Sequence, residues 1–267
     1  MMETGNLIEL KDARKSYRQG TLFGKNREIE ILHGINLAIR AGECLGLLGE
    51  SGCGKSTTAR IILGLERCGG EVLYKGKNIR GMDRADWREY RRNAQVVFQN
   101  SHGAVNPRFC AWEIVTEPLS YFEKLPKEEL RARAGDLLER VGVTGDVLDK
   151  LPSQFSGGEL QRVCIARAIA PRPEFIVLDE AVSALDMLNQ SRVLDLIAQL
   201  KRETGAAFLF ISHDLRVLVK VCDALAVMKS GRITTRIENI SNIEQNADAF
   251  DEEFKNLASA VLPAEPR

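Results

Sequence analysis

The sequence predicts an α/β fold in which a core of parallel strands and helices is interrupted by a block of helices. Short apolar runs that end at glycine or acidic residues alternate with helical patterns in the first 100 residues and again after residue 160, as is typical of buried parallel strands. Between them, residues 101–155 carry apolar side chains at helical spacing. The 267 residues suffice for one large domain with an inserted subdomain, or for two small domains.

The amino-terminal part is expected to consist mainly of strands, and the compact apolar run 44–48 is the clearest of them. This run ends at Gly49, as a buried parallel strand does, and helical character follows over residues 55–65. The polar stretch 18–30 is expected to form a loop. The other strands predicted here are residues 8–10, 35–39, 71–74 and 95–98.

The central and carboxy-terminal parts differ in pattern. Helical spacing predicts helices over residues 114–122, 128–141, 146–151 and 159–170. Strand character returns at residues 175–178, 207–211 and 224–228, with helices between these runs. From residue 237 the chain becomes acidic and weakly patterned, which predicts an appendage or a loose tail.

Composition narrows the functional classes. Lys plus Arg and Asp plus Glu each number 37, so the chain lacks the basic surplus of a nucleic-acid-binding protein. The six cysteines form no CxxC pair, which favours reduced thiols over disulfides or a zinc site. The polar start of the chain does not resemble a signal peptide, and no apolar stretch approaches the roughly 20 residues of a membrane span. A role in a membrane process is therefore expected to be carried out from the cytoplasmic side.

The stretch GESGCGKST matches GxxxxGK[ST] and follows a predicted strand. Glycines let backbone N–H groups turn towards phosphate oxygens, Lys55 would reach the β- and γ-phosphates, and Ser56 would bind Mg²⁺. The alternative is a glycine-rich turn that ends in Lys-Ser by chance. A chance match to this pattern arises in on the order of 1% of chains of this length, so the alternative has little weight. The sequence therefore predicts a nucleoside triphosphate site.

A second acidic feature follows the apolar run Phe175-Ile176-Val177-Leu178. A buried parallel strand would deliver Asp179 and Glu180 at its carboxyl end, where α/β proteins bind ligands. Asp179 suits the Mg²⁺ shell, and Glu180 is the candidate that orients or deprotonates the attacking water. Without Lys55, a surface turn would be the better interpretation of this pair.

The run FSGGELQRV carries a second pair of adjacent glycines before a predicted helix. Backbone N–H groups at a helix N-terminus bind anions, and Ser156 adds a hydroxyl. A chain with two phosphate cradles and one acidic strand end suggests a site assembled from halves.

With GESGCGKST, FSGGELQRV and IVLDEAVSALD in this order, the chain resembles the nucleotide-binding subunit of an ABC transporter over residues 7–232. The resemblance implies a P-loop NTPase core of the RecA type with an antiparallel β subdomain and an inserted α-helical subdomain. It implies Mg²⁺ bound by Ser56, Gln99 and Asp179, and a signature segment, Ser156, Gly157, Gly158 and Glu159, that acts on the partner's ATP. The residues expected to bind ATP are Tyr17, Gly49, Glu50, Ser51, Gly52, Cys53, Gly54, Lys55, Ser56 and Thr57.

Four residues gain their expected roles only from this resemblance. Gln99 resembles the Q-loop glutamine, which senses the γ-phosphate and Mg²⁺, and His213 resembles the switch histidine; with Glu180 they form the expected catalytic set. Asp186 resembles the D-loop aspartate, and Tyr17 the aromatic residue that stacks on adenine. Each also has a plain interpretation: a loop glutamine, an exposed polar residue after a strand, the cap of a helix near residue 187, and a surface aromatic.

The family architecture implies partners and a location. Two ATP-binding subunits, paralogous or identical, would face each other head to tail and close on ATP. They would drive two transmembrane permease subunits, and indirectly an extracytoplasmic solute-binding protein, from the cytoplasmic face of the inner membrane. The expected division is residues 1–100 and 161–236 for the two parts of the nucleotide-binding core, 101–160 for the helical subdomain and 237–267 for the appendage.

The transport class is narrowed by resemblance to the ATPases of peptide and nickel importers. It is based on Asn106-Pro107-Arg108, on Glu117-Pro118-Leu119 and on the final residues 258–263. Ala181, where many peptide importers carry proline, favours the nickel-import members. His102 is expected to be an ordinary loop residue rather than a metal ligand. A peptide importer, a soluble ABC ATPase and a regulatory subunit without turnover are the alternatives.

The signature departs from the common LSGGQ, because Phe155 and Glu159 replace leucine and glutamine. Glu159 brings negative charge near a polyphosphate, which would weaken closure slightly. We expect tolerance, with the side chain pointing away while the backbone binds.

Overall fold

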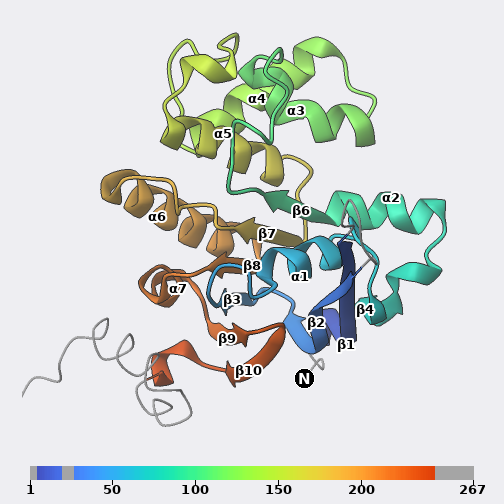
Figure 1. The fold of residues 1–267 in the computed structure, drawn as a ribbon. Helices are drawn as coiled ribbons and strands as arrows, with labels where there is room; N and C mark the ends of the chain where they lie inside the picture. Colours follow the sequence, from blue (N-terminus) through green and yellow to red (C-terminus); the bar gives the residue numbers. More distant parts are fainter. Residues whose placement is uncertain (1–4, 20–26, 244–267) are drawn as a thin grey trace, which may run out of the picture. The chain divides into compact units, whose positions relative to one another are not determined.

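The computed structural model describes residues 5–19 and 27–243 (Figure 1). The chain divides into two compact units. We call residues 1–82 and 207–267 the sheet unit, and residues 83–206 the insert unit. The predicted terminal signature at residues 258–263 and most of the predicted appendage lie outside the described residues.

The sheet unit contains an antiparallel sheet with the strand order β2-β1-β4-β5. Its members are β1 (Asn6–Gln19), β2 (Arg27–Arg40), β4 (Gly69–Tyr74) and β5 (Lys77–Asn78). Ile8 and Leu10 pair with Ile39 and Leu37, and all four side chains are buried. The antiparallel β subdomain that the family resemblance implied is therefore present.

β1 and β2 are much longer than the short strands that were predicted, and the prediction of a loop over residues 18–30 is wrong at both of its ends. Tyr17 pairs with Ile29, and Arg18 with Glu28. These residues are polar or half exposed, and cross-strand backbone bonds hold them in the sheet rather than burial. Residues 20–26 of the predicted loop lie outside the described part of the chain.

The sheet unit also contains four strands in the order β10-β9-β3-β8, of which β9, β3 and β8 are parallel. β3 (Cys44–Leu48) is fully buried and pairs in parallel with β8 (Ala207–Ser212) and β9 (Ala224–Lys229), as its apolar run predicted. β10 (Arg232–Ile237) pairs antiparallel with β9. The helices α1 (Lys55–Ile62) and α7 (Leu215–Val221) follow β3 and β8, and single 3-10 turns lie at Ile79–Gly81 and Ile240–Asn242.

The insert unit starts with α2 (Arg84–Asn93), which leads into β6 (Ala94–Val97). The strand β6 pairs in parallel with β7 (Phe175–Asp179). α3 (Ala111–Phe122), α4 (Lys127–Arg140) and α5 (Gly157–Ile169) pack against one another, as Figure 1 shows within this unit. A 3-10 turn at Pro152–Gln154 precedes α5, and α6 (Met187–Thr204) ends the unit. The predicted helical block is thus confirmed, with the parallel pair beside it.

The helix predicted over residues 146–151 does not form. This segment instead makes turns, and the carbonyls of Lys150 and Leu148 accept the backbone N–H groups of Ala111 and Trp112. Those two N–H groups belong to the first turn of α3, where a helix has no internal acceptors. The segment therefore serves as a cap for α3, which its short apolar pattern did not indicate.

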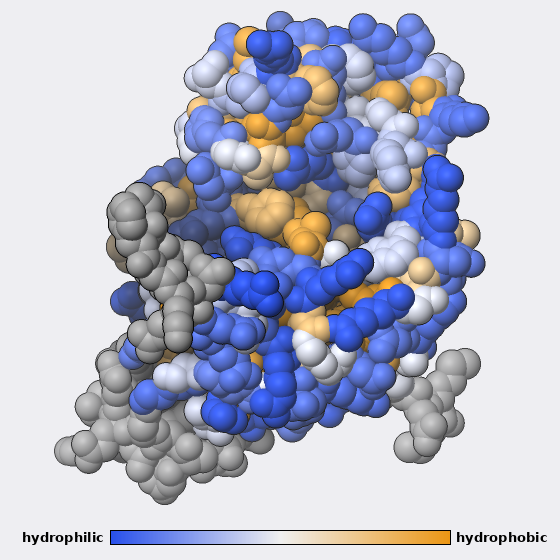
Figure 2. All heavy atoms as spheres, turned by 45° about the vertical axis from the view of Figure 1, so that its right-hand side comes forward, coloured by the Kyte–Doolittle hydropathy of each residue, from blue (hydrophilic) through white to orange (hydrophobic). Residues whose placement is uncertain are grey.

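The surface agrees with the high content of charged residues. Figure 2 shows a face dominated by hydrophilic side chains, with smaller apolar areas among them. None of the helices that the structure describes has the length and hydropathy that a bilayer crossing requires.

Candidate functional site

The stretch 49–57 connects β3 to α1 in the sheet unit, as a phosphate-binding loop should. Lys55 is 5% exposed, and its Nζ donates to the carbonyls of Gly49 at 2.6 Å and Glu50 at 2.8 Å. Both of these acceptors are neutral, so a phosphate that approached the buried ammonium would bring the negative charge that the carbonyls lack. The position of Lys55 fits a nucleotide's polyphosphate.

The loop requires glycine at two positions for measurable reasons. Gly54, the N-cap of α1, has φ 113°, and a Cβ there would lie 2.7 Å from Cδ2 of Leu32. A Cβ on Gly49 would lie 2.4 Å from the carbonyl oxygen of Met228. The loop therefore leaves no room for side chains at these points, which is the condition for bare backbone N–H groups to face a ligand.

The loop is also fixed to its surroundings. The Gly231 N–H donates to the carbonyl of Cys53 at 3.0 Å, and the hydroxyl of buried Thr58 donates to the carbonyl of Gly54 at 3.0 Å. Burial raises the pKa of the Cys53 thiol, which keeps it protonated at neutral pH. Ser51 and Gly52 are exposed, whereas Ser56 and Thr57 are half buried at the start of α1.

Gln99 and Glu180 meet in the insert unit. The register of β6 on β7 pairs Val97 with Leu178, so the residues after both strands emerge side by side. The Nε2 of Gln99 donates to Oε2 of Glu180 at 3.1 Å. Asp179 closes β7, and both acidic side chains are partly exposed. A strand end that offers two carboxylates and an amide oxygen supplies the ligand types that Mg²⁺ prefers.

The backbone at Glu180 is unusual, because its φ is 48°. Non-glycine residues adopt this left-handed conformation rarely, and it clusters at functional sites. The Ser183 hydroxyl donates to the Glu180 carbonyl at 3.0 Å, and Gln99 Nε2 lies 3.4 Å from the same hydroxyl. Ser183 thus holds the backbone of Glu180, and Gln99 holds its side chain.

The predicted signature forms the start of α5. Ser156 is its N-cap, and, apart from the adjoining backbone, none of the described residues comes within 4 Å of a Cβ built on Gly157. On Gly158 a Cβ would meet Cγ of Asn189 at 3.0 Å. The first glycine is therefore open to a ligand, and the second is required for close packing.

Asp186 caps α6, as the plain interpretation of this residue had it. Its carboxylate accepts from the N–H groups of Leu188 and Asn189, at 3.1 and 3.0 Å, and from Nδ2 of Asn189 at 2.5 Å. These bonds, first that of the Asn189 N–H, lower the pKa of Asp186. Asn189 consequently links the predicted D-loop to the second signature glycine within the insert unit.

Tyr17 and His213 lie in the sheet unit. Tyr17 is 38% exposed, its hydroxyl donates to Glu66 at 2.5 Å, and the Lys15 ammonium lies 5.0 Å from its ring centroid. His213 is exposed directly after β8, and the neighbouring Asp214 caps α7 through the Arg216 N–H. The two residues are accessible, as stacking on adenine and contact with a phosphate would require.

Sequence reasoning missed one face of α5. Gln161 accepts a hydrogen bond from the buried Ser101 hydroxyl, the Cys164 thiol lies 4.0 Å from the Ser101 carbonyl, and Arg167 donates to the Ala104 carbonyl at 2.7 Å. The three α5 residues are spaced three apart, so they share one side of the helix. Polar residues at this spacing in an otherwise buried helix were the available signal. They tie the signature helix to the segment that follows Gln99.

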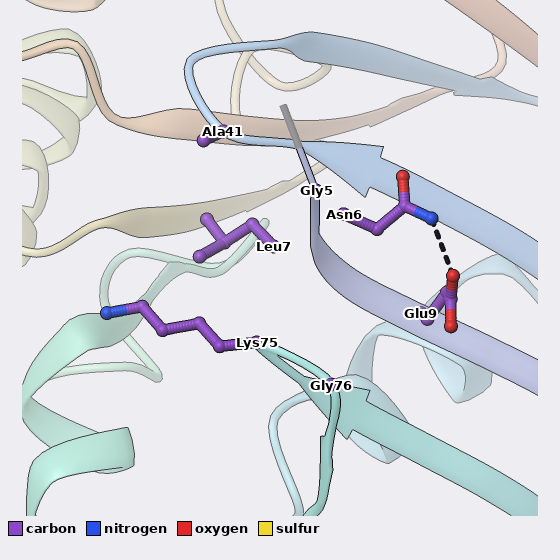
Figure 3. A pocket seen from close by; sticks show the side chains of 7 residues that line it. All are labelled: Gly5, Asn6, Leu7, Glu9, Ala41, Lys75 and Gly76. Atoms are coloured by element: carbon purple, nitrogen blue, oxygen red, sulfur yellow. Dashed lines mark hydrogen bonds between the residues drawn. The ribbon is translucent and has the colours of Figure 1, made fainter. Parts of the chain in front are cut away.

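A pocket of about 480 Å³ lies in the sheet unit, at the start of β1 and the β4–β5 turn. Figure 3 shows Lys75 and Leu7 among its lining side chains and the 2.5 Å hydrogen bond from Asn6 to Glu9. None of its lining residues belongs to the motifs predicted from sequence. Among the described residues, no cluster of three or more His, Cys, Asp or Glu side chains could hold a metal ion.

Comparison with known proteins agrees with this arrangement. Relatives include the nickel import ATP-binding protein NikE of Rhodospirillum rubrum, 43% identical over 97% of this chain and 93% of the relative. The NikE protein of Escherichia coli K12 is 41% identical over 97% of this chain and 96% of the relative. The predicted resemblance to nickel-import ATPases is confirmed.

Solved structures agree as well. The dimeric post-hydrolysis state of the ATP-binding cassette MJ0796, bound to ADP and Pi, has a TM-score of 0.77 at 30% identity and covers 87% of this chain and 98% of its own. The cbiO1 protein of Clostridium perfringens, part of the cbiONQ complex, has a TM-score of 0.75 at 25% identity, with 97% and 96% covered. The predicted fold class is thereby confirmed. Residues 32–183 match the profile described as ABC transporter, and the chain therefore belongs to the ABC transporter family and carries its ATPase domain.

Proposed function

We propose that this chain is the ATP-hydrolysing subunit of an ABC importer that takes up nickel, as the ion or as a chelate. The observation that carries the proposal is the identity of 41–43%, over 97% of the chain, to proteins named nickel import ATP-binding protein NikE. The segments around residues 106–108 and 117–119 resemble those of peptide importers as well as nickel importers, so a di- or oligopeptide is the alternative cargo.

In the sheet unit, the stretch from Gly49 to Thr57 binds the phosphates of ATP. Lys55 exchanges its carbonyl partners for the β- and γ-phosphates, because an ammonium gains more from an anion than from a neutral acceptor. Tyr17 stacks on the adenine, and His213 contacts the γ-phosphate. The steric requirement for glycine at residues 49 and 54 supports this assignment.

In the insert unit, Glu180 positions and deprotonates the attacking water, and Gln99 orients Glu180 through its amide. Asp179 and Gln99, with Ser56 of the phosphate-binding stretch, would hold Mg²⁺. When bound, Mg²⁺ supplies positive charge that neutralises the phosphate oxygens in the transition state. The hydrogen bond between Gln99 and Glu180 supports these roles, because a general base must be held in place before it acts.

The signature residues Ser156, Gly157, Gly158 and Glu159 act on ATP held by a second ATP-binding subunit, paralogous or identical. Asp186 lies at the same junction by virtue of its bond to Asn189. Open space above Gly157 supports a ligand there. The complete transporter adds two transmembrane permease subunits and, outside the membrane, a solute-binding protein.

The subunit works at the cytoplasmic face of the inner membrane as a peripheral protein. Residues 1–100 and 161–236 supply the nucleotide-binding core, and 101–160 the helical subdomain with the signature; the appendage expected over residues 237–267 lies mostly outside the described residues. The bonds from α5 to residues 101 and 104 give a physical route by which the signature and the Gln99 region respond together.

A paired uptake measurement tests the cargo. A strain that lacks the gene is compared with its parent for uptake of labelled nickel under nickel limitation and of labelled peptides. Nickel uptake should fall to background and return with the wild-type gene, while peptide uptake is unchanged. Unchanged nickel uptake together with lost peptide uptake would replace nickel by peptide in the proposal.

A further inference from the structure

The carboxylate of Glu159 occupies both hydrogen-bond donors of Ser156. Its Oε2 accepts from the Ser156 backbone N–H at 2.8 Å and from the Ser156 hydroxyl at 2.8 Å. In return, the Glu159 N–H lies 3.3 Å from the Ser156 hydroxyl oxygen. The pair forms a complete capping box at the start of α5. The expectation that this side chain points away from the signature is therefore wrong.

These donors are the ones that the signature would offer to a phosphate. A serine hydroxyl and a backbone N–H at a helix N-terminus bind an anion because both point outward and the helix dipole favours negative charge. Here one carboxylate oxygen already accepts from both. The Ser156 N–H and then its hydroxyl hold the pKa of Glu159 below 4.5, so the competing group is an anion at neutral pH.

We propose that Glu159 competes with the partner subunit's ATP for Ser156, so that closure of the two subunits requires the carboxylate to release the serine. This inference rests on the proposed function, because it assumes that the signature binds the partner's nucleotide. The γ-phosphate and the carboxylate need the same donors, and two anions that approach the same donors repel each other. Glu159 thereby raises the ATP concentration at which the transporter closes.

The capping box alone does not account for a charged residue at this position. Glutamine fills the third position of a capping box as well as glutamate does, and its amide oxygen accepts the same two bonds without a net charge. Hydrogen bonds to a charged acceptor are about twice as strong as neutral ones. The Glu159→Gln substitution therefore keeps the cap, weakens the competition and removes the repulsion.

The chain provides a matched control in α3. Glu113 occupies the same position of a second capping box, where its Oε2 accepts from the Cys110 N–H at 2.9 Å and from the Cys110 thiol at 3.1 Å. It lies in none of the nucleotide motifs. Glu113→Gln thus makes the same chemical change at a helix start without touching a phosphate donor.

The test is an ATP titration of the turnover rate of the purified transporter assembly. Glu159→Gln should lower the half-saturating ATP concentration by about 5-fold, the difference between a charged and a neutral hydrogen bond, and Glu113→Gln should leave it unchanged. Glu159→Ala should lower it too, while thermal denaturation of this variant shows the loss of the cap. An unchanged or higher half-saturating concentration in Glu159→Gln would overturn the inference.

A separate variant distinguishes this failure from a failure of the proposed function. If Glu180→Gln abolishes turnover and Glu159→Gln leaves the ATP dependence unchanged, the competition is wrong and the ATPase assignment stands. If Glu180→Gln retains full turnover, the measured hydrolysis does not depend on the proposed base of this chain; the catalytic assignment then fails, and the titration no longer reports on this chain.

Discussion

The side-chain amide of Gln99 lies 3.1 Å from the carboxylate of Glu180, and the hydrogen bond between them joins the ends of two adjacent parallel strands. Because Glu180 also has φ 48°, its carboxylate is positioned by a strained backbone and by one amide donor. Loss of either constraint should therefore affect the same step of catalysis.

We expect Gln99→Ala to lower the turnover rate by at least 10-fold, because the carboxylate that orients water loses the donor that holds it and Mg²⁺ loses a ligand. The measurement is the steady-state ATPase rate at saturating ATP. Gln95→Ala is the matched control: this glutamine lies on β6, the strand that Gln99 follows, but its Nε2 donates to the Arg91 carbonyl at the end of α2. Equal loss of turnover in both variants would indicate general damage to the strand.

Lys55→Ala should abolish ATP binding, because it removes the buried ammonium, which is the one cationic side chain in the stretch 49–57. Binding of a fluorescent ATP analogue provides the readout. Lys75→Ala removes a lysine of the same sheet unit, in the pocket beside β1, and should bind ATP as the wild type does. Wild-type affinity in Lys55→Ala would overturn the phosphate-loop assignment.

Gly54→Ala should destabilise the protein by about 1–3 kcal/mol, because a positive φ and a close contact with Leu32 must both be accommodated. Gly135→Ala is its opposite: the site in α4 has open space and no positive φ, so alanine should stabilise the helix by up to about 1 kcal/mol. Chemical denaturation of the two variants measures both changes. A neutral Gly54→Ala would show that the loop is less tightly packed than described.

We expect Glu113 to contribute to the stability of the folded protein in a way that acid removes. The Cys110 N–H, then the Cys110 thiol, lower its pKa from 4.5. A carboxyl whose pKa is lower in the folded state than in the unfolded state stabilises the folded protein at pH values above the unfolded-state pKa. This contribution is lost as the pH falls through the folded-state pKa. The melting temperature of Glu113→Gln should therefore lie below that of the wild type at pH 7, and the gap should close under strongly acidic conditions. A gap that does not change with pH would refute the assignment.

The strands of the parallel core were predictable because each consists of a continuous apolar run, which is the local pattern of a buried strand. The run 44–48 is apolar throughout, and β3 occupies these same residues. α2 was not predicted, since its ten residues are mostly polar and Tyr90 is the one buried side chain among them, so no apolar run marks the helix. Long-range pairing, which extends β1 to Gln19, and the use of Leu148 and Lys150 carbonyls as acceptors for α3 leave no trace in a local pattern.

The candidate site divides in the same way. The loop around Lys55 and the strand end at Asp179 were predictable, because each needs a particular residue type at a fixed distance from a strand. The position of the Glu159 carboxylate on Ser156 was missed, although Ser-x-x-Glu at a helix start is the pattern of a capping box and was the available signal. The role of Asn189 could not be predicted, because its side chain contacts Gly158, which is distant in sequence.

The most direct test of the central claim is the Glu180→Gln variant of the purified assembly. The account predicts that it binds Mg-ATP with affinity close to that of the wild type and loses nearly all hydrolysis, because an amide cannot accept the proton of the attacking water. Undiminished hydrolysis in this variant would contradict the account.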